Sequence, residues 1–225
     1  DTKSDKVLNP LLFGLPISDN VAPDIIRLAM YDRNYSTYEQ TPRYISLKKI
    51  GNNYQTAPGT INVSSDKISF AITAFDRYSG STNQNGIYGA AIYLDKKFLS
   101  GFEMDSISYD ETRYLNAHID YKTKNSGGPF LQHLCMLPGY EDGIYKNASG
   151  EDGVITLRDT LEHQVYIVVK DANGNTSTLD FKLRNTNSIH SSDAVTDDRP
   201  MFRPGMVNIF EKNGLAFYMP EKCIY

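Results

Sequence analysis

Short runs of β-type sequence, broken by glycine, asparagine and aspartate, dominate this chain of 225 residues. Amphipathic helical periodicity is nearly absent, whereas β-branched and aromatic residues recur in short segments. The clearest predicted strands are residues 25–31, 43–49, 67–75, 87–94, 98–104, 130–137, 164–170 and 176–183. The pattern therefore predicts an all-β chain.

Alternation and turn chemistry define the best strands. Residues 68–75 alternate large apolar side chains with small or polar ones, which is typical of a sheet packed on one side. Asp171-Ala-Asn-Gly-Asn175 separates two strong strand patterns, and Gly174 supplies the positive φ that a tight reversal needs. We expect one helical exception at residues 110–121, where apolar residues recur at helical spacing after an Asp110 N-cap.

Composition along the chain predicts four parts. Residues 1–19 are interpreted as the exit segment of an upstream domain, and residues 20–185 as a β-sandwich. Residues 186–200 are rich in serine, threonine, asparagine and aspartate, as in a linker. Residues 201–225 are expected to start an incomplete second β module with a hairpin at 207–219. Its unpaired edges favour self-association.

Charge and hydropathy argue against two kinds of partner. Lysine and arginine total 23 against 27 aspartate and glutamate residues, and the basic residues are scattered. Nucleic-acid binding needs a concentrated basic face, so it is disfavoured. Every apolar run is much shorter than the roughly 20 residues that span a bilayer, so no membrane span is expected.

Two similar turns carry a family resemblance. Ala74-Phe-Asp-Arg-Tyr-Ser-Gly80 and Val169-Lys-Asp-Ala-Asn-Gly-Asn175 each join a strand to a glycine-containing return. Both resemble bacterial immunoglobulin-like domains, whose last hairpin often has a D-x-x-G-N turn. The resemblance implies an immunoglobulin-like antiparallel β-sandwich with insertions and one short helix.

A narrower resemblance concerns residues 102–121, followed by Leu137-Pro-Gly139. They resemble the region after the catalytic domain of Gram-negative lysostaphin/LytM-type zinc peptidases, and Val7-Leu-Asn-Pro10 resembles that domain's exit. This implies a non-catalytic accessory module that positions or regulates a cell-wall metalloendopeptidase. It also implies a location in the cell envelope, periplasmic or secreted. The implied partners are the upstream peptidase domain and peptidoglycan or another envelope protein.

The zinc ligands of that family have no counterpart in this chain. The family uses a His-x-x-x-Asp pair and a His-x-His pair, because a catalytic zinc needs three protein ligands and an open position. The histidines of this chain, His118, His133, His163 and His190, match neither spacing. We therefore expect no enzymatic activity and no cofactor in this chain, with zinc held by the parent's catalytic domain.

A group of tyrosines favours ligand binding. Tyr31, Tyr35, Tyr38 and Tyr44 crowd one region, and exposed tyrosine rings offer amphipathic contact area to sugars or peptides. Packing between neighbouring strands is the other interpretation of the same residues. A carbohydrate- or peptide-binding module is thus an alternative function, and a surface adhesin built of tandem immunoglobulin-like repeats is another.

Two aspartates that end strands are candidate calcium ligands. Asp76 and Asp171 could share the ion with nearby carbonyl groups, since calcium takes several oxygen ligands. The alternative is that both only stabilise turns through Asx hydrogen bonds.

Two further groups invite simpler interpretations. His118, His133 and Asp120 could converge on a metal, but such residues are more often satisfied by ordinary hydrogen bonds. Cys135 is expected to be a small buried apolar residue, and its pairing with Cys223 stays open.

Overall fold

The computed structural model describes residues 5–14, 18–140, 143–187, 202, 207–212 and 215–220. The chain divides into two units, Asp1–Ile189 and His190–Tyr225. Residues 188–200 of the predicted linker lie outside the described residues, and so does Cys223.

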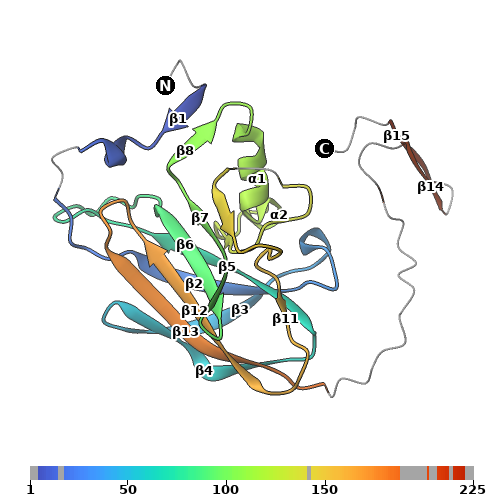
Figure 1. The fold of residues 1–225 in the computed structure, drawn as a ribbon, viewed down its shortest axis with the longest axis horizontal. Helices are drawn as coiled ribbons and strands as arrows, with labels where there is room; N and C mark the ends of the chain where they lie inside the picture. Colours follow the sequence, from blue (N-terminus) through green and yellow to red (C-terminus); the bar gives the residue numbers. More distant parts are fainter. Residues whose placement is uncertain are drawn as a thin grey trace. The chain divides into compact units, whose positions relative to one another are not determined.

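Strands are the main regular secondary structure of the first unit, and the all-β prediction is confirmed (Figure 1). Its strands are β1 (Lys6–Leu8), β2 (Asp24–Asp32), β3 (Arg43–Ile50), β4 (Asn53–Val63), β5 (Lys67–Phe75), β6 (Gly89–Leu94), β7 (Lys97–Glu103), β8 (Ser106–Ser108), β9 (Gln132–His133), β10 (Tyr145–Asn147), β11 (Ile155–Thr156), β12 (Glu162–Lys170) and β13 (Thr176–Asn185). In place of the single predicted helix there are α1 (Leu115–His118) and α2 (Tyr121–Asn125), after a 3₁₀ turn at Thr112–Tyr114.

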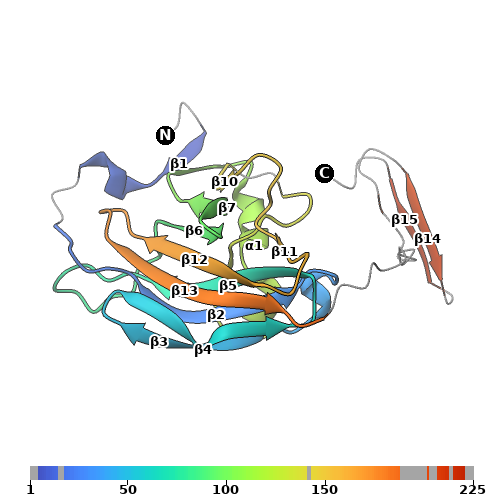
Figure 2. The same ribbon diagram turned by 60° about the horizontal axis from the view of Figure 1, so that its bottom comes forward.

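One large sheet curls over and packs against itself. Its strand order is β10-β7-β6-β12-β13-β4-β3-β2-β5-β11, and β9 also pairs with β5. The two halves face each other across the core, where the Phe70 ring of β5 meets the Phe181 ring of β13 edge-on at 5.1 Å (Figures 1 and 2). Among the described residues the pairs are antiparallel except that β4 runs parallel to β13. This parallel pair corrects the expectation of a wholly antiparallel sandwich.

Strand β4 was not predicted, because Ala57-Pro-Gly59 interrupts its sequence like a turn. The structure accommodates this interruption as an irregularity in the pairing with β13. The register passes from Gln55 opposite Asp180 to Thr60 opposite Lys182. Proline lacks the N–H that a ladder needs and is tolerated at such a bulge.

The core lies between the two halves of the curled sheet. Its largest fully buried side chains include Phe70, Phe102, Leu28, Ile61, Ile68, Ile72, Ile92, Ile144 and Ile155. A second, smaller cluster on the opposite face of β2 and β5 consists of Ala29, Tyr31, Ala71 and Leu131. Strand β5 is therefore packed on both faces, which corrects the prediction of one-sided packing.

Residues 130–137 were predicted as a strand, but only Gln132–His133 form one, the short strand β9. Leu131, Leu134 and Leu137 of this segment are buried outside regular structure, whereas Phe130 is exposed. Their apolar run reflects burial of a loop against the sandwich, since a short apolar run does not itself specify strand geometry.

The N-terminal segment lies against the sandwich through a small separate sheet. Strand β1 pairs antiparallel with β8, with Val7 opposite Ile107. Asn9 extends this contact, because its N–H donates to Asp105 O at 2.9 Å and its side chain donates to Met104 O at 3.0 Å. The segment before β2 is thereby fixed to the region just after β7.

In the second unit, β14 (Asn208–Lys212) and β15 (Leu215–Met219) form an antiparallel hairpin, as predicted for 207–219. Within the described residues, no helix has the length and apolar character needed to cross a membrane.

Candidate functional site

An aromatic row crosses the outer face of strands β7, β6 and β12. Tyr93 of β6 lies opposite Phe98 of β7 on one side and Tyr166 of β12 on the other. The ring centroids are 5.5 Å apart for Tyr93 and Phe98 and 6.2 Å apart for Tyr93 and Tyr166. Side chains alternate along a strand, so the neighbours Ile92 and Ile167 point into the core. Tyr166 is 39% exposed, which leaves an aromatic surface open to solvent.

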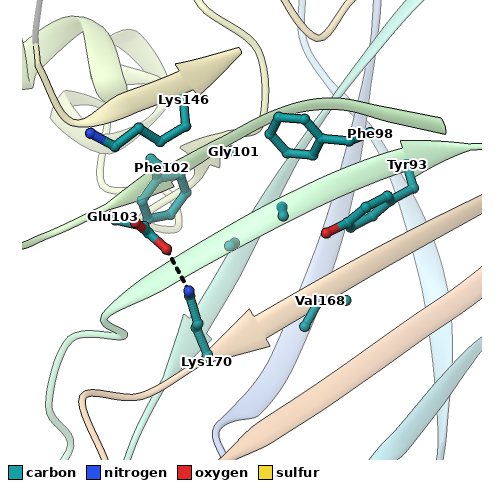
Figure 3. Close-up of a pocket in the computed structure, with 10 residues that line it drawn as sticks. Tyr93, Phe98, Gly101, Phe102, Glu103, Lys146, Val168 and Lys170 are labelled. Carbon is teal, nitrogen blue, oxygen red and sulfur yellow. Dashed lines mark hydrogen bonds and ion pairs between the residues drawn. The ribbon is translucent and has the colours of Figure 1, made fainter. Parts of the chain in front are cut away.

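A row of small residues beside the aromatic row forms the floor of a hollow. Ala91 lies opposite Gly101 of β7 and Val168 of β12. The hollow has a volume of about 190 Å³ (Figure 3). A Cβ atom on Gly101 would lie 2.7 Å from Ala90 O and 3.1 Å from Ala91 Cα, so this close approach of β7 to β6 requires glycine.

Charged groups form the other wall of the hollow. Lys170 of β12 and Glu103 of β7 flank Gly89 of β6 and form an ion pair across it (Figure 3). The Lys170 ammonium also lies 5.3 Å from the ring centroid of Tyr88. Lys146 of β10 stands exposed at the end of the hollow. The hollow thus combines an aromatic wall with charged hydrogen-bonding groups.

A second hollow, of about 460 Å³, adjoins the aromatic row and shares Tyr93 and Val168 with the first. It is lined by Tyr93 and Tyr166 together with the polar side chains of Lys96, Gln164 and Asp180. The aromatic row is therefore a ridge that adjoins two hollows. We call the ridge and both hollows the aromatic groove.

The carboxylates of the aromatic groove are too far apart to act as a glycosidase pair. Glu103 lies on β7 and Asp180 on β13, and β6 and β12 separate these strands. Three strand spacings amount to about 14 Å. Glycoside hydrolases place their two carboxyl groups roughly 5 to 9.5 Å apart. The geometry of the groove therefore suits binding.

The structure separates the four predicted tyrosines. Tyr31 is completely buried, and its hydroxyl group donates to Asp120 Oδ2 at 2.8 Å, so it does not belong to a ligand-binding face. Tyr35, Tyr38 and Tyr44 are exposed, with exposed fractions of 58%, 52% and 42%. Tyr44 also packs against Arg27, whose guanidinium carbon lies 5.1 Å from the ring centroid.

The predicted calcium ligands Asp76 and Asp171 do come together, and Asp19 joins them. Asp171 also makes the predicted Asx turn, because its Oδ1 accepts hydrogen bonds from the N–H groups of Asn173 and Asn175. Burial raises the pKa of Asp76 to about 6, and the negative charges of Asp171 and Asp19 add to the effect. Burial alone would raise the pKa of Asp19, but hydrogen bonds from Val21 and Ser79 outweigh it and lower that pKa.

His118, His133 and Asp120 lie in one buried region, but hydrogen bonds account for two of them. Both ring nitrogens of His118 have partners, Tyr145 Oη at 3.0 Å and Gln132 Nε2 at 3.2 Å. Asp120 accepts from Tyr31 and from both the N–H and the hydroxyl group of Thr123. The simpler interpretation therefore holds for His118 and Asp120, whereas His133 Nδ1 is buried without a hydrogen-bond partner.

Sequence reasoning missed the residues of the aromatic groove. The available signal was the strand period, because Tyr93 and Tyr166 fall on the phase opposite to the core residues of β6 and β12. Their alignment depends on the register of β6 with β12. These two strands are far apart in sequence, because 67 residues lie between Leu94, the end of β6, and Glu162, the start of β12. No short-range pattern specifies that register.

Comparison of the chain with models of protein families, with curated proteins and with solved structures found no match.

Proposed function

We propose that this chain is a non-catalytic β-sandwich module that binds carbohydrate along the aromatic groove. The observation that carries the proposal is the continuous ridge of Phe98, Tyr93 and Tyr166 beside two hollows with polar walls. A pyranose ring presents C–H groups that pack on an aromatic face. Its hydroxyl groups then reach donors and acceptors at the sides.

The polar groups around the ridge suit this ligand. Lys146, Lys170 and Lys96 offer donors, and Glu103 and Asp180 offer acceptors. Lys96 lies in the turn between β6 and β7, and the other four side chains come from four strands of one sheet. A site built on strands is preorganised, so little conformational entropy is lost on binding. Peptidoglycan is the polysaccharide that the family resemblance favours, and it would place the module in the cell envelope.

The test is affinity electrophoresis and pull-down with purified peptidoglycan and a panel of soluble polysaccharides. Tyr166→Ala removes the most exposed ring of the ridge, so we expect its affinity to fall about tenfold, which corresponds to roughly 1.4 kcal/mol. Tyr38→Ala is the matched control, because Tyr38 is exposed and lies outside the groove. Circular dichroism of each variant checks the fold.

Binding that survives Tyr166→Ala but is lost in Tyr38→Ala would move the site to the tyrosines that the sequence singled out. A wild-type chain that binds none of the glycans would contradict the proposal altogether.

A second candidate function is the positioning of a cell-wall metalloendopeptidase domain that precedes residue 1. The observation that favours it is the pairing of β1 with β8, extended by Asn9, which fixes the exit segment to the sandwich. A preceding domain would thereby have its orientation restricted. We expect the isolated chain to release no fragments from peptidoglycan in the presence of zinc, as measured by chromatography. Cleavage that a chelator abolishes would contradict this role.

A further inference from the structure

Three carboxylates from distant parts of the sequence meet at one end of the sandwich. Asp19 precedes β2, Asp76 follows β5, and Asp171 follows β12. One carboxylate oxygen of each residue lies within 4.8 Å of those of the other two. The cluster is separate from the aromatic groove, with which it shares no residue.

Hydrogen bonds satisfy only part of this cluster. Both carboxylate oxygens of Asp171 accept hydrogen bonds, Oδ1 from two backbone N–H groups and Oδ2 from Asn175 Nδ2 at 2.7 Å, which leaves Oδ2 a further lone pair. Asp19 Oδ1 accepts from Ser79, whose N–H lies at 2.8 Å and hydroxyl group at 2.9 Å. By contrast, Asp19 Oδ2 and Asp76 Oδ1 are buried without a hydrogen-bond partner. Asp76 is only 4% exposed, so its free oxygen has little access to bulk water.

No basic side chain neutralises the cluster within the part of the chain that the structure describes. Arg77 and Lys170 are the sequence neighbours of Asp76 and Asp171, but they form their ion pairs with Asp24 and Glu103. A buried carboxylate without a partner is costly, and three carboxylates in contact repel one another. This arrangement needs a positive charge that the described residues do not supply.

We propose that Asp19, Asp76 and Asp171 bind a calcium ion. The donors are all oxygen atoms, which suit hard cations, and the set lacks the histidine or cysteine that zinc prefers. Calcium fits better than magnesium because it takes six to eight oxygen ligands in flexible geometry, completed by backbone carbonyls and water.

Calcium at this cluster would join three segments. Strand β5 belongs to one half of the curled sheet and β12 to the other, and Asp19 lies in the entry segment. Binding would therefore hold the two halves together at this end and fix the entry segment to both.

The experiment is calorimetric titration and thermal unfolding of the full chain with CaCl₂, against the same protein in chelator. At about 5 mM calcium, well above the dissociation constants of extracellular calcium modules, we expect the melting temperature to rise by roughly 5 °C. Magnesium at the same concentration should give a smaller rise. Asp76→Asn should remove both the binding heat and the calcium-dependent rise.

Two comparisons separate a lost ion site from a damaged fold. Asp76→Asn should melt in chelator at or above the wild-type temperature, because it removes one negative charge from the cluster. Asp110→Asn, which changes an exposed aspartate elsewhere, should keep the full calcium response. Should Asp76→Asn fail to fold, Asp19→Asn provides the same test.

Terbium luminescence is an independent readout, since a nearby tyrosine sensitises bound terbium. Tyr78 lies two residues from Asp76, and the protein has no tryptophan. We expect a signal that calcium displaces and that Tyr78→Phe reduces. Absence of calcium binding in the wild-type chain, or a full calcium response in Asp76→Asn, would overturn the proposal. Neither result would affect the aromatic groove, whose test uses glycan binding alone.

Discussion

At the scale of single residues, Tyr31 and Asp120 form a buried hydrogen bond between distant parts of the sequence. Tyr31 is fully buried, and its hydroxyl group lies 2.8 Å from Asp120 Oδ2. Burial raises the pKa of Tyr31, and the hydrogen bond to Asp120 raises it further, so the phenol remains a donor. The contact links β2 to the residue that caps α2, because Asp120 Oδ1 accepts from Thr123 N at 2.8 Å. A side chain singled out for ligand binding therefore stabilises the fold.

The change Tyr31→Phe tests this role. It leaves a buried carboxylate with one donor fewer, so we expect the free energy of unfolding to fall by about 1.5 to 3 kcal/mol. Urea denaturation followed by circular dichroism measures the loss. Tyr38→Phe is the control, since Tyr38 is 52% exposed and should unfold like the wild type. Equal stability of both variants would show that the Asp120 contact contributes nothing.

At the scale of elements, α1 delivers His118 into a chain of hydrogen bonds that requires a neutral ring. The hydroxyl group of Tyr145 donates its proton to His133 O at 3.0 Å, so it accepts from His118 Nδ1. Gln132 Nε2 donates to His118 Nε2, which must then carry no proton. Burial lowers the pKa of His118 to about 3, with a contribution from His133, whose own pKa burial lowers to about 4.

These two histidines predict an acid-sensitive fold. A histidine in the unfolded chain titrates near pH 6.5, so between that value and the lowered pKa the unfolded state binds more protons. The free energy of unfolding is therefore unaffected by these histidines above about pH 6.5. Below that value it falls with the pH, by up to about 1.4 kcal/mol per pH unit for each histidine. Urea denaturation between pH 8 and pH 4 should therefore show a steep acid limb, and His118→Gln should make that limb shallower.

His163 provides the contrasting control for this pH profile. The hydrogen bond to Asp95, together with that to Asp159, raises its pKa. Its stabilising contribution to the free energy of unfolding is therefore complete below about pH 6.5, and this contribution disappears as the pH rises through the raised pKa. His163→Gln should change the profile above pH 6.5 and leave the acid limb intact. An acid limb that is identical in wild type and His118→Gln would contradict the neutral network.

The elements that sequence predicted well are those whose local pattern and tertiary environment agree. Strands β12 and β13 bury alternate side chains, and the Asp171 turn joins them as expected. Strand β4 was missed because its Pro58 needs a bulge that only its pairing with β13 reveals. The cluster around Asp76 was half predicted, since Asp19 lies far away in sequence and carries no motif. The aromatic groove could not be predicted, because it depends on strand register.

At the scale of the whole molecule, every residue of the main core lies in the first unit, between Ile25 and Leu183. The second unit contains the β14–β15 hairpin, in which Phe217 and Tyr218 are 50% and 63% exposed. A two-stranded hairpin is marginal by itself, and its open edges can pair with another chain. We therefore assign stability to the first unit and self-association to the second.

Removal of residues 190–225 tests this division. We expect the shortened chain to melt within about 2 °C of the full chain, because its core is intact. Light scattering should show concentration-dependent association of the full chain and a monomer after shortening. An unfolded shortened chain would refute the assignment of stability, and a full chain that stays monomeric at high concentration would refute the role of the hairpin.

The parallel pairing of β4 with β13 has a mechanical consequence. Strands β2 and β4 are both antiparallel to β3, so β2, β4 and β13 run in the same direction. The chain enters β2 beside the first residues of β13, where the Ser177 hydroxyl group donates a hydrogen bond to Pro23 O. It leaves β13 at the opposite end of that strand. These ends are about 33 Å apart, the length of a ten-residue strand. A pulling force applied at the two ends would act along β13 and load its hydrogen bonds in shear. Many hydrogen bonds would then have to break together, so the first unit would resist mechanical unfolding.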